Sequence, residues 1–230
     1  MREGGVNMVK TIACTFLLAL GCTAFTCMAG SENKSASKHI IQVLKLTSEK
    51  SSLLKEFFDD VDLDKILDPT NTREETCDKR QEEYVWAITA LSEEAISLIL
   101  CHVLDVHIHA RVYKKNTGNE LIVVASQRGN HGQTWDFEFF DFDVRTNRLT
   151  PRTQESVGIL QPKENEFLAR NQKLRPSENG VTFLRLNEDG TIEAFPWTWM
   201  ETRWENRTPA YRVVFKWNGS SFSKRITIQP

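Results

Sequence analysis

The chain has 230 residues, of which 29 are basic and 31 acidic, and its formal net charge is −2. This near balance, without a block of like charge, gives no electrostatic footprint for nucleic acid or for an anionic membrane. With 40% hydrophobic and 10% aromatic residues, the chain can build a folded core and is not a disordered protein.

The first thirty residues have the order of a secretory signal. Lys10 precedes an apolar run over residues 11–24, and Cys27 and Ala29 place small residues before Gly30. This run is about fourteen residues long, whereas a membrane-spanning helix needs about twenty. We therefore predict that residues 1–29 are a signal peptide, with Met8 as an alternative start. The mature protein is expected to be exported, to the periplasm, the cell exterior or the outer membrane.

An alternative cleavage before Cys22 would make the protein a lipoprotein attached to a membrane. Gly21-Cys22 resembles the end of a bacterial lipobox, although Ala19 and Leu20 fit that pattern less well. Cleavage after Ala29 instead leaves an even pair of cysteines, Cys77 and Cys101, as is usual in an oxidising compartment. We favour this soluble form, without a transmembrane segment, and expect the pair to form a disulfide.

The stretch after the signal is predicted to be flexible over residues 30–38 and then helical over residues 39–104. Ile40, Leu44, Leu54 and Phe58 fall on one helical stripe within residues 39–58, with a break expected at Thr47-Ser48-Glu49. Further helices are predicted over residues 62–67, 73–90 and 92–104. The last one begins at Ser92-Glu-Glu94, a pattern typical of a helix N-cap, so Cys77 and Cys101 are expected on two helices.

From residue 105 the apolar period changes from helical to alternating, which predicts a half-buried strand over residues 105–113. Further strands are expected over residues 120–127, 134–144, 148–152, 181–186, 191–199, 210–217 and 222–228, with a loop and helix at 164–174. Short turns such as Asn218-Gly219 favour hairpins. The expected fold class is α+β, with N-terminal helices packed on a C-terminal antiparallel sheet of meander hairpins (105–230), and residues 39–230 forming one domain.

A metal site is one hypothesis for the first of these strands. His107 and His109 share a strand face with Asp105 beside them, and His131 or His102 could supply a third ligand. Two imidazoles and a further strong ligand suit zinc or non-haem iron. The same face carries Arg111, a pattern equally typical of a solvated polar face, so we assign no cofactor.

Residues 135–143 alternate aromatic and acidic side chains and break phase at Phe139-Phe140, which predicts a β-bulge. Two carboxylate pairs could serve acid-catalysed glycoside hydrolysis, although such pairs usually come from different strands. The pairs are Asp136 with Glu138, and Asp141 with Asp143. The simpler interpretation is an aromatic core face backed by solvated acids.

The densest aromatic stretch contains the candidate binding residues Trp197, Trp199, Glu201, Arg203 and Trp204. Exposed tryptophans can stack on sugar rings while the charged side chains form hydrogen bonds at the ring edges. The alternative is that these rings fill the core.

The sequence contains no Gly-x-Ser-x-Gly elbow, P-loop or dinucleotide fingerprint. The leading hypothesis is therefore an exported, non-catalytic binding or interaction protein with a glycan or protein partner. Two alternatives stay open. One is an exported hydrolase, metal-assisted through His107 and His109 or acid-catalysed; the other is a structural envelope protein.

Overall fold

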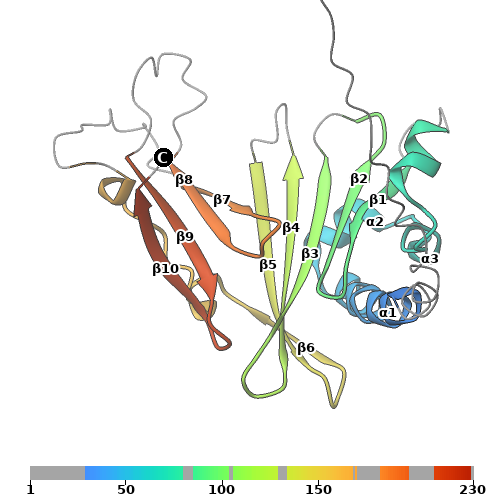
Figure 1. The fold of residues 1–230 in the computed structure, drawn as a ribbon, viewed down its shortest axis with the longest axis horizontal. Helices are drawn as coiled ribbons and strands as arrows, with labels where there is room; N and C mark the ends of the chain where they lie inside the picture. The colour runs from blue at the N-terminus through green and yellow to red at the C-terminus, as the bar shows by residue number, and fades with distance from the viewer. Residues whose placement is uncertain are drawn as a thin grey trace, which may run out of the picture.

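The computed structural model describes residues 29–79, 85–103, 106–128, 134–167, 169, 182–196 and 210–228. These residues form N-terminal helices and ten strands in two antiparallel sheets (Figure 1), so the fold is α+β with a large β content. No helix in these ranges is long and apolar enough to cross a membrane. Residues 1–28 lie outside them, so export, the cleavage site and lipid attachment at Cys22 stay predictions.

The helices are α1 (Ala29–Ser48), α2 (Ser52–Phe58) and α3 (Leu63–Ile66), followed by one π-helical turn, η1 (Glu74–Asp78). Helix α1 begins at Ala29 and so includes residues 30–38, where the sequence predicts a flexible segment. The predicted break after α1 is present. Ser51 caps α2, its hydroxyl accepting a hydrogen bond from the backbone N–H of Leu54 at 3.0 Å.

The first sheet has the strand order β1-β2-β3-β4-β5-β6 and the second has the order β10-β9-β8-β7. The strands of the first sheet are β1 (Trp86–Leu91), β2 (Ala95–Leu100), β3 (His107–Lys114), β4 (Glu120–Arg128), β5 (Thr134–Asp143) and β6 (Arg148–Arg152). Those of the second sheet are β7 (Thr182–Leu186), β8 (Ile192–Pro196), β9 (Tyr211–Trp217) and β10 (Phe222–Ile228). The strands expected after residue 105 are present, with small differences in their ends. In the predicted loop and helix at 164–174, the described residues form one short 3-10 helix, η3 (Glu164–Phe167).

The helices predicted over residues 73–90 and 92–104 are wrong, because residues 86–100 form the hairpin β1–β2, although Glu74–Asp78 form the helical turn η1. Ser92 lies in the turn of this hairpin, where its hydroxyl accepts a hydrogen bond from the backbone N–H of Ala95 at 3.0 Å. Ser92, predicted to cap a helix, therefore closes a β-turn. A serine hydroxyl can accept a hydrogen bond from a nearby backbone N–H both at a helix N-terminus and in a turn. The first sheet consequently begins at Trp86 and not near residue 105.

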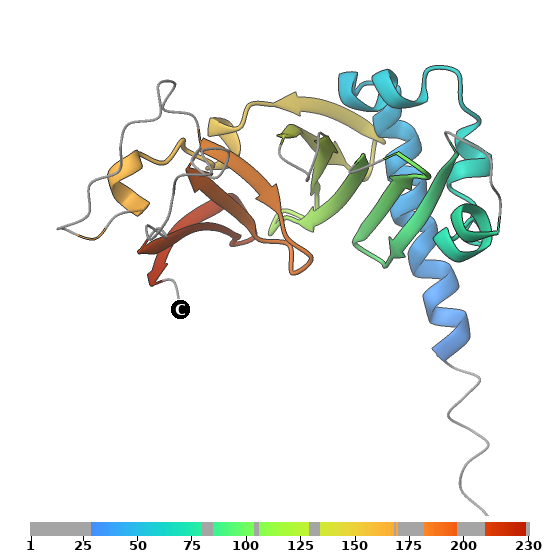
Figure 2. The same cartoon turned by 90° about the horizontal axis from the view of Figure 1, so that it is seen from above.

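The first sheet is the middle layer of the molecule. On its central strand β4, Ile122 and Val124 belong to a hydrophobic cluster that includes α1, α2 and α3. Leu121 and Val123 belong to a second cluster, shared with β7–β10. Figure 2 shows the helices and the second sheet on opposite sides of the first sheet. A strand buried on both faces has a nearly continuous apolar sequence, as β4 has.

The bulge predicted at Phe139-Phe140 is also wrong. The pairing of β5 with β4 runs without a shift from Glu120↔Phe142 to Arg128↔Thr134. Phe139 lies in the cluster with the second sheet and Phe140 in the cluster with the helices. Two adjacent aromatic residues are therefore accommodated because both faces of β5 are covered. The bulge of this sheet lies in β1 instead, where the register shifts between Ile88 and Ala90.

The predicted disulfide between Cys77 and Cys101 is present, with a Cα–Cα distance of 5.2 Å. Its cysteines do not lie on two helices, however. Cys77 is part of η1 and Cys101 directly follows β2, and both are buried against Ala87. The disulfide thus ties the end of the helical segment to the β1–β2 edge of the first sheet.

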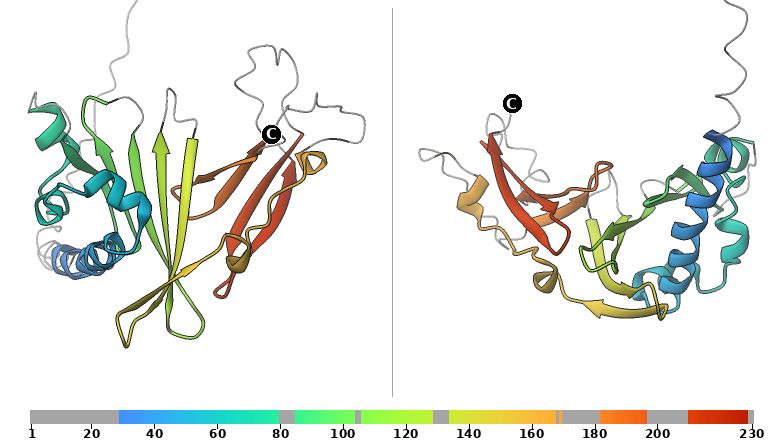
Figure 3. Two further views of the ribbon diagram at one scale, coloured as in Figure 1. Left: turned by 180° about the vertical axis from the view of Figure 1, so that it is seen from behind. Right: turned by 60° about the horizontal axis from the view of Figure 1, so that its bottom comes forward.

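The two sheets are joined by hydrogen bonds as well as by apolar contacts. The Tyr113 hydroxyl on β3 donates to the backbone carbonyl of Gly190 in the β7–β8 turn at 2.8 Å, and Arg111 donates to the carbonyl of Glu188 in the same turn at 2.7 Å. Trp217 on β9 donates to the carbonyl of Lys114 at 2.9 Å. Figure 3 shows the second sheet beside β3–β5, with the helices on the far side.

Candidate binding cleft on the first sheet

A cleft of about 490 Å³ lies over β1–β3, beside the β7–β8 turn. Both polar and apolar groups line it, from three separate parts of the chain: Thr89, Ala90, Leu91, Ser92, Ala95, Ile96, Ser97, His109, Ala110, Arg111, Leu186, Asn187 and Glu188. Thr89 stands at the β1 bulge, and its hydroxyl donates to the carbonyl of Ser97 at 3.2 Å. Bulges of this kind commonly redirect side chains beside binding sites.

His109 lines this cleft and is half-buried. Its Nδ1 is 2.8 Å from the Ser97 hydroxyl, its cross-strand neighbour. Burial, followed by the nearby charge of His107, lowers the pKa of His109 to about 4, and a contact with Gln127 acts weakly in the opposite direction. The imidazole is therefore neutral at pH 7, and it presents an uncharged hydrogen-bonding ring to the cleft.

An aromatic row extends from His109 along the same face of the sheet. Its members are His107, His109, Trp135, Phe137 and Phe139. Trp135 reaches across β4 to His109, with ring centroids 5.2 Å apart, over the fully buried Ala125. The planes of successive rings differ by 22° or less, so the rings are stacked and their faces cover one another. A ligand in the cleft would therefore meet ring edges more than ring faces.

The structure places His107 and His109 side by side on β3. Their rings are parallel within 12°, and the ring centroids are 5.9 Å apart. Two imidazole nitrogens that bind zinc at about 2.1 Å must converge on it. In the described ranges no group of three metal-binding side chains is present. Asp105 and His131 lie outside these ranges, so the metal hypothesis depends on His131 and stays a prediction.

The first candidate acid pair points toward the helices, away from the cleft. Asp136 forms an ion pair with Arg128 at 2.9 Å. Glu138 accepts a hydrogen bond from the backbone N–H of Ser52 at 3.1 Å, at the beginning of α2. These two carboxylates therefore hold α2 against the sheet.

The second candidate acid pair is engaged at the β5–β6 hairpin. Asp141 forms ion pairs with Arg152 at 2.8 Å and with Lys115. Asp143 accepts hydrogen bonds from the backbone N–H groups of Arg145 and Thr146, and these bonds hold the pKa of Asp143 below its ordinary value. Each carboxylate of this pair thus has a structural contact.

The aromatic-rich stretch that supplied the candidates Trp197, Trp199, Glu201, Arg203 and Trp204 lies outside the described residues, so these candidates stay predictions. The cleft itself was missed by the sequence analysis. Part of its lining, with Thr89 and Ser97, comes from β1 and β2, in a segment predicted to be helical; the rest comes from β3 and the β7–β8 turn. The small and hydroxyl residues within 89–97 are the signal that could have indicated it.

No family model matches the chain, and no curated protein matches it. Among solved structures, a domain of an uncharacterized protein from Porphyromonas gingivalis W83 is similar to it, with 13% sequence identity and a TM-score of 0.47. The similarity covers 74% of this chain and 92% of that chain. A likeness of this degree supports no inference about function.

Proposed function

We propose that the protein is an exported, non-catalytic binding protein whose cleft on the first sheet holds a saccharide. The observation that carries this proposal is the lining of the cleft, in which hydroxyl, imidazole and charged side chains lie among apolar ones. Export rests on the order of charge, apolar run and small residues before Gly30.

The chemistry of the lining suits a ligand with hydroxyl groups on an apolar ring. The Thr89 and Ser97 hydroxyls and the Arg111 guanidinium offer hydrogen bonds, while Ala90 and Ala95 leave room for the C–H face of a sugar. A volume of about 490 Å³ lies in the range of small-molecule sites. The edge of the aromatic row adds an apolar surface next to these polar groups.

Binding is favoured over hydrolysis by the state of the one serine–histidine contact in the cleft. Ser97 and His109 are within hydrogen-bonding distance, but a pKa of about 4 makes this imidazole a poor proton acceptor at pH 7. Its Nε2 is buried and bonds to no carboxylate in the described part of the chain, so no carboxylate supports the ring as a base. The pair serves better as a hydrogen-bonding element of a binding site.

The test is calorimetric titration of the full chain with neutral hexasaccharides of glucose, N-acetylglucosamine and xylose. Ala90 is exposed and lines the cleft, so Ala90→Phe should fill the cleft without disturbing the core. We expect this variant to lose at least about tenfold in affinity, which corresponds to about 1.4 kcal/mol.

The matched control is Thr150→Phe, which adds the same ring at an exposed strand position of β6, away from the cleft. This control should bind as the unaltered protein does. Equal binding by Ala90→Phe and the unaltered protein, or failure of all three sugars to bind, would contradict the proposal.

A further inference from the structure

The outward face of the second sheet carries a regular array of charged side chains. The pairings Arg185↔Glu193, Glu193↔Val214 and Arg225↔Val214 place these four residues in one row across β7, β8, β9 and β10. Lys216 and Arg212 lie two residues to either side of Val214 on β9, on the same face. The opposite face, with Ile192, Val213 and Phe215, is in the core.

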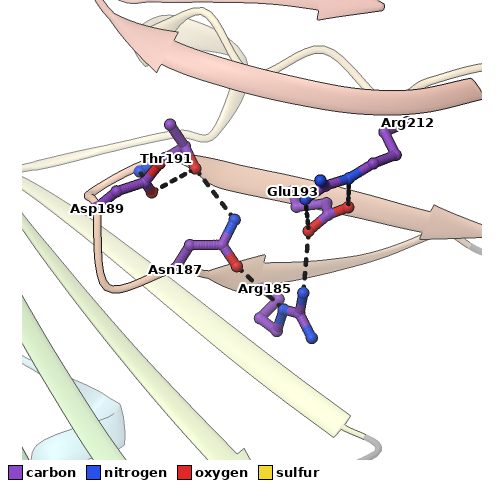
Figure 4. A network of polar contacts seen from close by, with 6 residues as sticks. All are labelled: Arg185, Asn187, Asp189, Thr191, Glu193 and Arg212. Atoms are coloured by element: carbon purple, nitrogen blue, oxygen red, sulfur yellow. Dashed lines mark hydrogen bonds and ion pairs between the residues drawn. The ribbon is translucent and has the colours of Figure 1, made fainter. Parts of the chain in front are cut away.

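Glu193 holds two of these cations in fixed positions. Its carboxylate accepts hydrogen bonds from Arg212 at 2.6 and 2.9 Å and from Arg185 at 3.0 Å (Figure 4). Burial would raise the pKa of Glu193, but the hydrogen bonds and charges of Arg212, and then those of Arg185, lower it below its ordinary value. The carboxylate is therefore ionised at neutral pH, and it orders two guanidinium groups that stay substantially exposed, at 41% for Arg212 and 47% for Arg185.

The face has more positive than negative charge, although the whole chain is slightly acidic. Arg185, Arg212, Lys216 and Arg225 stand against Glu193 on the face and Asp189 at its rim. Lys216 and Arg225 are both exposed, and Asp189 is engaged with the backbone N–H and hydroxyl of Thr191 at 2.9 and 2.6 Å. We infer that this outward face of β7–β10 binds an acidic polysaccharide, separately from the cleft on the first sheet.

The form of the face favours a charged polymer over a folded protein partner. Protein interfaces depend on apolar or aromatic anchors in their centre. The apolar residue at the centre of this face is Val214, which is half-buried between charged neighbours. The aromatic pair of this face, Phe183 and Phe195, lies at its β7–β8 end, where the guanidinium of Arg185 stands over the Phe195 ring at 4.6 Å. Guanidinium groups bind carboxylate and sulfate groups in a forked geometry, and cations on neighbouring strands can contact successive anionic groups of one chain.

The experiment measures binding of the full chain to immobilised polygalacturonate, dextran sulfate, neutral dextran and poly-L-glutamate. We expect binding to a charged polysaccharide, none to dextran, and weaker binding as salt is added. The variant Lys216→Ala/Arg225→Ala removes two exposed cations without touching the Glu193 contacts. It should bind about tenfold more weakly. The control Lys50→Ala/Arg145→Ala removes the same charge from exposed positions at the end of α1 and in the β5–β6 turn, and should bind normally.

Preference for polygalacturonate or for dextran sulfate identifies the anion as carboxylate or sulfate, and either result supports the inference. If both double variants lose the same affinity, binding depends on net charge alone, and the inference is overturned. Tighter binding to poly-L-glutamate than to either polysaccharide would assign the face to an acidic protein, also against the inference. Self-association at low salt that the Lys216→Ala/Arg225→Ala change abolishes would assign the face to a second copy of the chain instead.

Discussion

At the scale of single residues, His109 shows how burial changes the chemistry that a residue type suggests. Its spacing from His107 indicates a pair of metal ligands, yet the folded chain places it between Ser97 and Trp135, stacked and without charge. A sequence pattern shows which side chains share a strand face, but it does not show how their rings are turned. The orientation depends on the neighbouring strands: Trp135 of β5, which pairs with Gln127 on β4, stacks diagonally on the His109 imidazole.

The lowered pKa of His109 gives a stability prediction. Between pH 6.5 and about 4, the unfolded chain binds a proton at His109 that the folded chain does not bind. The free energy of unfolding should therefore fall as the pH falls through this window, by up to about 3 kcal/mol. In His109→Gln, which keeps a neutral hydrogen-bonding group, the His109 part of this decrease should be absent, while the part due to carboxylates such as Glu193 remains. Urea unfolding of both proteins at the two ends of the window measures the difference, and NMR titration of the imidazole gives the pKa directly. An imidazole that titrates near pH 6.5 would refute the assignment.

At the scale of elements, the helices before residue 68 and the strands after residue 105 were predictable, whereas the segment 73–104 was not. Strands such as β6 and β10 have turn residues on both sides, and their ends agree with the alternating pattern. In β1, Trp86 and Ile88 face the helices while Ala87 is covered by the disulfide, so both faces are buried. Apolar and polar residues then no longer alternate along the strand. The spacing of Ile88 and Leu91, which resembles that of a helix, therefore does not indicate one. Tertiary burial decided the structure of this segment, and local periodicity could not show it.

The disulfide between Cys77 and Cys101 should stabilise the element pair η1 and β1–β2. A bridge across 24 residues is worth about 3 kcal/mol, because it restricts the unfolded chain. Cys77→Ser/Cys101→Ser should therefore unfold at lower denaturant concentration, and amide exchange should accelerate first in residues 74–78 and 86–91. The unaltered protein should approach the variant when a reductant is added, whereas the variant should not respond to it. Identical midpoints in all these samples would show that the bridge contributes nothing to stability.

At the scale of the whole molecule, the cleft exists because three distant segments meet. Its lining comes from residues 89–97, from His109, Ala110 and Arg111 of β3, and from residues 186–188 at the end of β7 and in the β7–β8 turn. The sequence alone predicted the strand that carries His109, but no local pattern relates that strand to the β7–β8 turn. Their contact depends on how the two sheets pack, and hence on the apolar cluster formed by Tyr113, Leu121, Val123 and the inner face of β7–β10. A site assembled in this way becomes visible only in the folded protein.

The contact between Arg111 of the first sheet and the β7–β8 turn of the second sheet can be tested at Gly190. This glycine has φ +80°, and a Cβ there would lie 2.6 Å from Nε of Arg111, the side chain that bonds the β7–β8 turn. Gly118 has a similar φ of +85° with nothing within 4 Å, so Gly118→Ala measures the backbone strain alone, about 1 kcal/mol. Gly190→Ala should cost about 1 kcal/mol more, because the guanidinium must leave the carbonyl of Glu188.

The same change should also weaken saccharide binding, since Arg111 lines the cleft. A double-mutant cycle separates the two effects. In an Arg111→Ala background there is no guanidinium to displace, so Gly190→Ala should cost only as much as Gly118→Ala. Unfolding by denaturant, followed for all single and double variants, supplies the free energies. If the two glycine substitutions cost the same in the unaltered background, Arg111 does not hold the β7–β8 turn, and the cleft must owe its closed side to the apolar cluster alone.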